Sequence, residues 1–172
     1  SEINLVRYTT SEITALFKEV KYDLEEVRDS KLIKPIDIGL LPNEIKNIGN
    51  TKERKEMFIK IVLPLIVKEN NKIRIDRKRL FTILGKNSNT DIENKWLEKK
   101  YKQYGARQND LSTLKIRMDE IPVSLAIAQA AKETGWGTSR FALKGNALFG
   151  QWTWSGEGSV SYTHLRAHET KT

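Results

Sequence analysis

The sequence has no cysteine, only four prolines and no long apolar run, and each scarcity excludes a class of protein. Without cysteine the chain can form neither disulfide bonds nor thiolate zinc sites. Hydrophobic residues make up 38% and charged residues 30%, which is typical of a folded chain rather than a disordered one. The longest apolar candidate, residues 59–67, is interrupted by Lys60 and Pro64, and a span needs roughly 20 residues. We therefore expect a globular protein with no transmembrane segment.

The positive charge is concentrated in one part of the chain. Of the 30 Lys and Arg residues, 16 fall in residues 51–107, against 7 Asp and Glu, and the densest run is Lys72–Arg79. A basic face can attract cell-wall polymer, lipid headgroups or nucleic acid. Basic residues at helical spacing are also typical of a solvated helix surface, and we favour that interpretation. No nucleic-acid partner is expected.

Apolar residues at spacings of three and four predict a mostly helical chain. Five helical stretches follow from this pattern, and they cover residues 11–30, 51–84, 91–104, 111–118 and 122–134. We expect Thr10 or Ser11 to cap the first stretch and Pro64 to kink or break the second. The sequence Thr90-Asp-Ile-Glu93 is typical of a capping box. The core side of the second stretch is expected to include Ile73, Leu80, Phe81 and Leu84.

The segment from Ile121 to Trp154 carries the chemistry. It reads IPVSLAIAQAAKETGWGTSRFALKGNALFGQWTW, and it places Glu133 in the last turn of an alanine-rich helix. Such a narrow helix is expected to be central and packed closely on every side. A Gly-Trp-Gly turn follows, then a Gly145-Asn146 turn, and the first strand pattern begins at Leu148.

Several residues of this segment suit a sugar-cleaving site. Two features favour the protonated form of Glu133, which a general acid requires: the negative end of the helix dipole and the apolar neighbour Trp136. Gly137 leaves room for a substrate close to the backbone, and Asn146 can hydrogen-bond either the backbone or the acetamido group of an amino sugar. Flat apolar faces for a pyranose ring come from Phe149, Trp152 and Trp154. Taken singly, each of these residues is more typical of a surface, a turn or a core.

Taken together, the motifs resemble a known family. Glu133-Thr-Gly-Trp-Gly followed by Gly145-Asn146-Ala-Leu-Phe149-Gly150 is similar to the catalytic motif of glycoside hydrolase family 73, the peptidoglycan-cutting glucosaminidases. The Bax-like branch is the most similar. The resemblance covers Ile121–Trp154 and extends weakly back to Lys52.

The resemblance implies a fold, a reaction and a site. The fold would be a mostly α, lysozyme-like α+β domain with a short β segment starting near residue 148. In the intact parent protein, the reaction would be hydrolysis of the β-1,4 bond after N-acetylglucosamine in peptidoglycan glycan strands, with Glu133 as general acid. The sequence does not decide whether this fragment is itself active. Neither a metal nor an organic cofactor is implied, and the expected location is the cell envelope or periplasm. The implied substrate-binding residues are Trp136, Gly137, Asn146, Phe149, Gln151 and Trp152.

The end of the chain departs from the family pattern. The family continues into a second acidic residue and a tyrosine, whereas only 18 residues follow Trp154 here. Residues 160–170 resemble a translated transposase adaptor, and both histidines, His164 and His168, fall inside it with Glu169. We therefore reject a metal site there. The expected division is an N-terminal helix and linker at 1–50, a truncated lysozyme-like domain at 51–159, and an artefactual tail at 160–172.

Some alternatives stay open. Glu157 is the remaining candidate for a second carboxylate, and a substrate-assisted route would need none. A lytic transglycosylase could use the same fold and one glutamate. A non-catalytic basic module that binds wall polymer or nucleic acid would use Lys72–Arg79 as its footprint. The sequence does not fix the oligomeric state.

Overall fold

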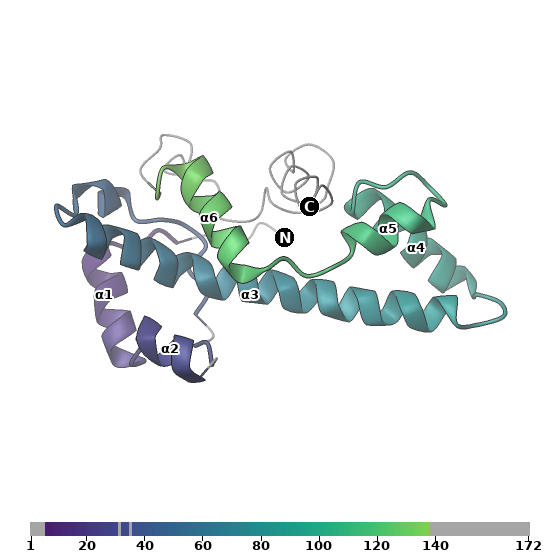
Figure 1. The fold of residues 1–172 in the computed structure, drawn as a ribbon, viewed down its shortest axis with the longest axis horizontal. Helices are drawn as coiled ribbons and strands as arrows, with labels where there is room; N and C mark the ends of the chain where they lie inside the picture. The colour runs from purple at the N-terminus through teal and green to yellow at the C-terminus, as the bar shows by residue number, and fades with distance from the viewer. Residues whose placement is uncertain (1–5, 31, 35, 138–172) are drawn as a thin grey trace. The chain divides into compact units, whose positions relative to one another are not determined.

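The computed structural model describes residues 6–30, 32–34 and 36–137, and within them it is helical with no strand (Figure 1). The expected mostly helical fold is therefore confirmed, and the predicted β segment near residue 148 lies outside the described residues. None of the described helices is both long and apolar enough to cross a membrane. The elements are α1 (Thr10–Glu19), α2 (Leu24–Ser30), the 3-10 helix η1 (Asn43–Asn47), α3 (Thr51–Leu84), α4 (Asp91–Gln103), α5 (Leu111–Arg117) and α6 (Val123–Thr134).

The described chain forms two compact units. The first contains the residues up to Val67 together with those from Val123 onward, and the second contains Lys68–Pro122. Helix α3 contributes its first half to one unit and its second half to the other.

In the first unit, the single helix predicted over residues 11–30 is wrong, because α1 ends at Glu19 and α2 starts at Leu24. Lys21 has a left-handed φ of 54°, and the Tyr22 amide donates to the Phe17 carbonyl at 2.8 Å. This reversal brings the Tyr22 ring to 5.1 Å from the Phe17 ring. The aromatic contact is a tertiary interaction that helical spacing alone does not encode.

The cap of α1 lies just before the predicted position. The Thr9 hydroxyl accepts from the Glu12 amide at 3.1 Å, and the Glu12 carboxylate accepts from the Thr9 amide at 3.2 Å. This capping box satisfies two amides that the helix itself leaves without partners. The prediction of Thr10 or Ser11 as the cap is therefore wrong.

Helix α3 runs through Pro64 without a break over 34 residues, so of the predicted kink or break, the break is absent. A proline inside a helix costs about 3 kcal/mol, because it removes a hydrogen bond and crowds the preceding turn. The neighbours Leu63, Leu65 and Ile66 are all buried. Burial of each such side chain contributes roughly 1.5–3 kcal/mol, which offsets the cost.

The core of the first unit is built where α1, the 36–50 segment and α6 pack on the first half of α3. Its buried side chains include Ile13, Phe17, Ile38, Leu41, Ile45, Phe58, Ile61, Val62, Ala126 and Ala130. α1 approaches α3 near Lys60, whose ammonium lies 5.6 Å from the Phe17 ring centroid, whereas the end of α6 packs at Phe58. The two helices therefore meet different faces of α3.

The second unit packs α4 and α5 on the second half of α3. The Thr90–Glu93 capping box is confirmed, and Asp110 caps α5. Phe81, predicted to face the core, is 45% exposed, while Ile83 is buried in its place. The buried hydrophobic side chains of this unit are Ile73, Leu80, Ile83, Tyr101, Tyr104, Leu114, Met118 and Ile121.

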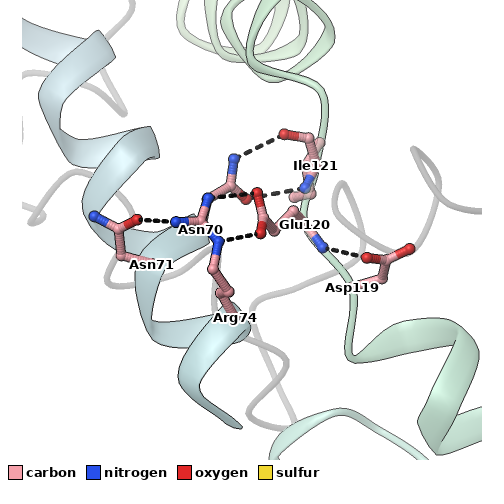
Figure 2. A network of polar contacts seen from close by, with 6 residues as sticks. All are labelled: Asn70, Asn71, Arg74, Asp119, Glu120 and Ile121. Carbon is pink, nitrogen blue, oxygen red and sulfur yellow. Dashed lines mark hydrogen bonds and ion pairs between the residues drawn. The ribbon is translucent and has the colours of Figure 1, made fainter. Parts of the chain in front are cut away.

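A buried polar clasp holds the segment that follows α5 (Figure 2). The Asn70 amide nitrogen donates to the Ile121 carbonyl at 2.8 Å, and its oxygen accepts from the Ile121 amide at 2.9 Å. Next to it, the Arg74 guanidinium makes two bonds to the Glu120 carboxylate, at 2.6 and 3.0 Å. The side chain of Asn70 therefore satisfies both the N–H and the C=O of Ile121, which in a helix or strand would bond to other backbone groups.

Candidate functional site

Helix α6 carries Glu133 in its last turn, on the side away from the core. The buried face of α6 consists of Ala126, Ala130, Ala131 and Thr134. Ala128 and Glu133 are exposed. The expectation that this helix is packed on every side is wrong for the part of the chain described here, since only one stripe of it is covered. The same asymmetry leaves the Glu133 carboxylate accessible.

The C-terminal end of α6 is held by a dense set of hydrogen bonds. The Trp136 amide donates to the Ala131 carbonyl at 2.9 Å, which is the 6→1 bond of a Schellman turn. The Thr134 hydroxyl donates to the Ala130 carbonyl at 2.6 Å and accepts from the Gly137 amide at 3.1 Å. The backbone that follows Glu133 is therefore fixed within one turn.

Three consecutive residues after the helix have left-handed backbone. Their φ angles are 56° at Gly135, 57° at Trp136 and 85° at Gly137. The predicted positive φ at Gly135 is confirmed. Trp136 is not glycine, and this conformation costs a side-chain-bearing residue roughly 1–2 kcal/mol. Packing of its ring and the surrounding hydrogen bonds must offset that cost.

The Gly-Trp-Gly turn is docked on the first half of α3. The half-buried Trp136 ring makes an edge contact with Phe58, with the ring centroids 5.7 Å apart. The Lys55 ammonium lies 4.7 Å from the centroid of the Trp136 ring. Both contacts come from successive turns of α3, and they anchor the turn that begins two residues after Glu133.

Gly137 is buried in the core of the first unit. A Cβ at this position would lie 3.0 Å from Leu41, 3.2 Å from Phe58 and 3.4 Å from Ile45. The space beside the glycine backbone is therefore filled by core side chains. Close packing explains the glycine here without any ligand.

The Glu133 carboxylate has one polar partner on its own helix. The Gln129 side-chain nitrogen donates to Glu133 Oε1 at 2.7 Å. Since Glu133 is exposed, the described residues do not enclose it in the apolar wall expected from Trp136, whose ring packs on Phe58 instead. Gln129 was not predicted as part of the site, although its spacing of four from Glu133 is the spacing of neighbours on a helix surface.

The remaining predicted site residues lie outside the described residues: Asn146, Phe149, Gln151, Trp152 and Glu157. The structure thus places three of the predicted residues at the C-terminal end of α6: Glu133 in the last helical turn, and Trp136 and Gly137 in the turn that follows. It adds Gln129 and Lys55 beside them. Within the described part of the chain, no group of three or more His, Asp or Glu side chains is arranged to hold a metal ion.

The basic run of α3 is largely engaged in contacts within the second unit. Arg77 donates from one nitrogen to the carbonyls of Lys115 and Met118, both at 2.7 Å. Arg79 lies 4.8 Å from the Trp96 ring centroid. The Arg74 guanidinium beside Glu120 lowers the pKa of that carboxyl, mainly through their hydrogen bonds. These contacts give the arginines structural roles and weaken the case for a nucleic-acid footprint.

Comparison with known proteins gives a family match over the segment that contains α6 and its end. Residues 108–171, which include α6 and Glu133, match the glucosaminidase family, described as mannosyl-glycoprotein endo-beta-N-acetylglucosaminidase. The matched segment is therefore similar to glucosaminidases, which are a class of glycosidase.

A curated relative points to the same branch. Protein bax of Escherichia coli (strain K12) is 33% identical over 113 residues, which are 62% of this chain and 41% of that protein. The chain thus spans less than half the length of this relative. No solved structure matches the chain. Together, the two matches confirm the resemblance to the glucosaminidase family and to its Bax-like branch.

Proposed function

We propose that this protein is a peptidoglycan hydrolase that cleaves the β-1,4 bond after N-acetylglucosamine, with Glu133 as general acid. The observation that carries the proposal is the position of Glu133. It is an exposed carboxyl at the end of α6, inside the segment that matches the glucosaminidase family, and a rigid turn follows it. A glycosidase needs a carboxylic acid that can reach the leaving-group oxygen. The proposed location is accordingly the cell envelope or periplasm.

The roles of neighbouring residues follow from their places on this turn. Gln129 orients the Glu133 carboxylate through its hydrogen bond to Oε1, which leaves Oε2 for proton transfer. Trp136 forms the near edge of the sugar site. We assign Gly137 a packing role, because its surroundings are core side chains. Asn146, Phe149, Gln151 and Trp152 remain proposed sugar contacts.

The second catalytic group follows one of two routes. Glu157 would serve as the base of an inverting enzyme if its carboxyl lies about 6.5–9.5 Å from that of Glu133. The acetamido group of the substrate would otherwise act as the nucleophile. Measuring the anomeric configuration of the first product by NMR separates these routes, because the first inverts the configuration and the second retains it.

The test compares Glu133→Gln with the wild-type chain on purified peptidoglycan, with release of reducing ends as the readout. Loss of a general acid should reduce cleavage by roughly 10²–10⁴-fold. Folding should be unchanged, because the side chain is exposed. The matched control is Glu98→Gln, which removes an exposed carboxylate from α4. Wild-type activity in Glu133→Gln would refute the assignment.

Mass spectrometry of the products tests the reaction itself. Hydrolysis leaves a reducing N-acetylglucosamine, whereas a lytic transglycosylase leaves an anhydro-muramic end. If the wild-type chain binds DNA with a steep salt dependence that Glu133→Gln does not change, and cleaves no glycan, the non-catalytic basic module is the better account.

A further inference from the structure

Lys55 contacts the Gly135-Trp136-Gly137 turn that follows the proposed catalytic helix end. It lies in the second turn of α3, its side chain is half-buried, and its ammonium sits 4.7 Å from the Trp136 ring centroid. Trp136 follows Glu133 by three residues and is fixed by the bond from its amide to the Ala131 carbonyl. The charge of Lys55 is therefore held beside the end of α6.

No described carboxylate neutralises this lysine. Among the residues that the structure describes, Lys55 makes no ion pair, and its recorded partner is the indole ring. Other basic residues of α3 are paired, since Lys72 contacts Glu69 at 3.1 Å and Arg74 contacts Glu120 at 2.6 Å. A cation–π contact orders the side chain and leaves the positive charge uncancelled.

The chemistry of the proposed substrate supplies the matching group. Alternate sugars of peptidoglycan carry a lactyl ether whose carboxyl is either free or extended by a peptide that bears further carboxylates. A polymer of N-acetylglucosamine alone has no such charge. A lysine of fixed position beside the catalytic turn can therefore distinguish these glycans by charge.

We propose that Lys55 and Trp136 form a subsite for a carboxylate of the glycan, next to the bond that Glu133 protonates. This proposal rests on the proposed function. In it, the Lys55 ammonium pairs with the carboxylate, and the indole holds the ammonium in place on α3.

The experiment measures binding, so it does not depend on turnover. Calorimetry compares two oligosaccharides of equal length with the Glu133→Gln chain, one alternating N-acetylglucosamine with free N-acetylmuramic acid and the other built of N-acetylglucosamine alone. An ion pair at a half-exposed site is worth up to about 1 kcal/mol, which corresponds to about fivefold in Kd. We expect the carboxylate-bearing oligosaccharide to bind about fivefold more tightly.

Three substitutions test whether Lys55 causes the preference for the carboxylate-bearing oligosaccharide. Lys55→Gln should abolish it while leaving the affinity for the neutral oligosaccharide unchanged. Lys55→Arg should retain it, because arginine keeps both the charge and the ring contact. The matched control Lys52→Gln, which removes an exposed lysine from the first turn of the same helix, should leave the preference intact. If Lys55 contributes to folding alone, Lys55→Gln should lower the affinity for both oligosaccharides equally.

The outcomes distinguish this proposal from the proposed function. If Lys55→Gln keeps the full preference, or the Glu133→Gln chain shows none, the subsite is refuted while glycan binding stands. If neither oligosaccharide binds, both the subsite and the proposed function are refuted. A third ligand, the muramic oligosaccharide with its peptides attached, identifies the carboxylate. Stronger binding of this ligand assigns a peptide carboxylate to Lys55, and weaker binding assigns the lactyl group.

Discussion

Substitution of Gly137 by alanine tests whether the Gly-Trp-Gly turn is anchored as described. The backbone at Gly137 has a φ of 85°, which costs a residue with a Cβ roughly 1–2 kcal/mol. The added methyl group would also meet Leu41 at 3.0 Å and Phe58 at 3.2 Å, and overpacking of a core costs roughly 1–3 kcal/mol. We therefore expect Gly137→Ala to lower the free energy of unfolding of the first unit by about 2–5 kcal/mol.

Urea unfolding followed by far-UV circular dichroism measures this change, and hydrogen exchange of the α6 amides locates it. The control is Gly49→Ala, because Gly49 is exposed and a Cβ there would meet nothing within 4 Å. This control should change the unfolding free energy by no more than about 0.5 kcal/mol. If Gly137→Ala is as stable as the control, the turn does not pack on Leu41 and Phe58 and the reasoning fails.

Two further predictions concern the second unit. Asn70→Ala should destabilise this unit by roughly 2–4 kcal/mol, because both backbone groups of Ile121 lose their buried partner. Thermal unfolding and hydrogen exchange at Ile121 measure this change. An unchanged unfolding midpoint would contradict the prediction. The second prediction concerns acid. The pKa of Glu120 is lowered in the folded state by Arg74, so its contribution is complete above the ordinary carboxyl pKa of about 4.3 and is lost as the pH falls through the folded value. Glu120→Gln should therefore flatten the acid limb of stability against pH in urea titrations, whereas a slope equal to that of Glu98→Gln would contradict the role of the ion pair.

Local signals were predicted well where a few neighbouring residues decide the structure. The Thr90–Glu93 capping box and the end of α6 at Gly135 depend on short-range hydrogen bonds and backbone sterics. The break expected at Pro64 is absent, because burial of its neighbours outweighs the local cost. Phe81 was predicted to be buried, whereas the structure buries Ile83 and exposes Phe81. Helical spacing gives the period of the apolar residues, but the position of α4 and α5 decides which side of α3 is covered.

The site was predictable in part. The order Glu-Thr-Gly-Trp-Gly indicated Glu133, and the structure gives it an exposed place at the end of α6. Gly137 was expected to make room for substrate, but its neighbours Leu41, Ile45 and Phe58 come from η1, the residues just before η1, and α3, all distant in sequence. Lys55 could not be predicted, since a lysine 81 positions before Trp136 gives no local sign of contact. The hydrogen bonds between Asn70 and Ile121 could not be predicted either, because a single asparagine inside a helix gives no sequence sign of a partner 51 positions away.

The left-handed turn after α6 also sets which substitutions the chain can accept there. Gly135 is exposed, so its constraint is the backbone alone, and asparagine should be the best tolerated replacement. Gly137 combines the same backbone constraint with a filled core, and no side chain meets both. In a library randomised at these two positions, functional clones should therefore show glycine with some asparagine at 135 and glycine alone at 137.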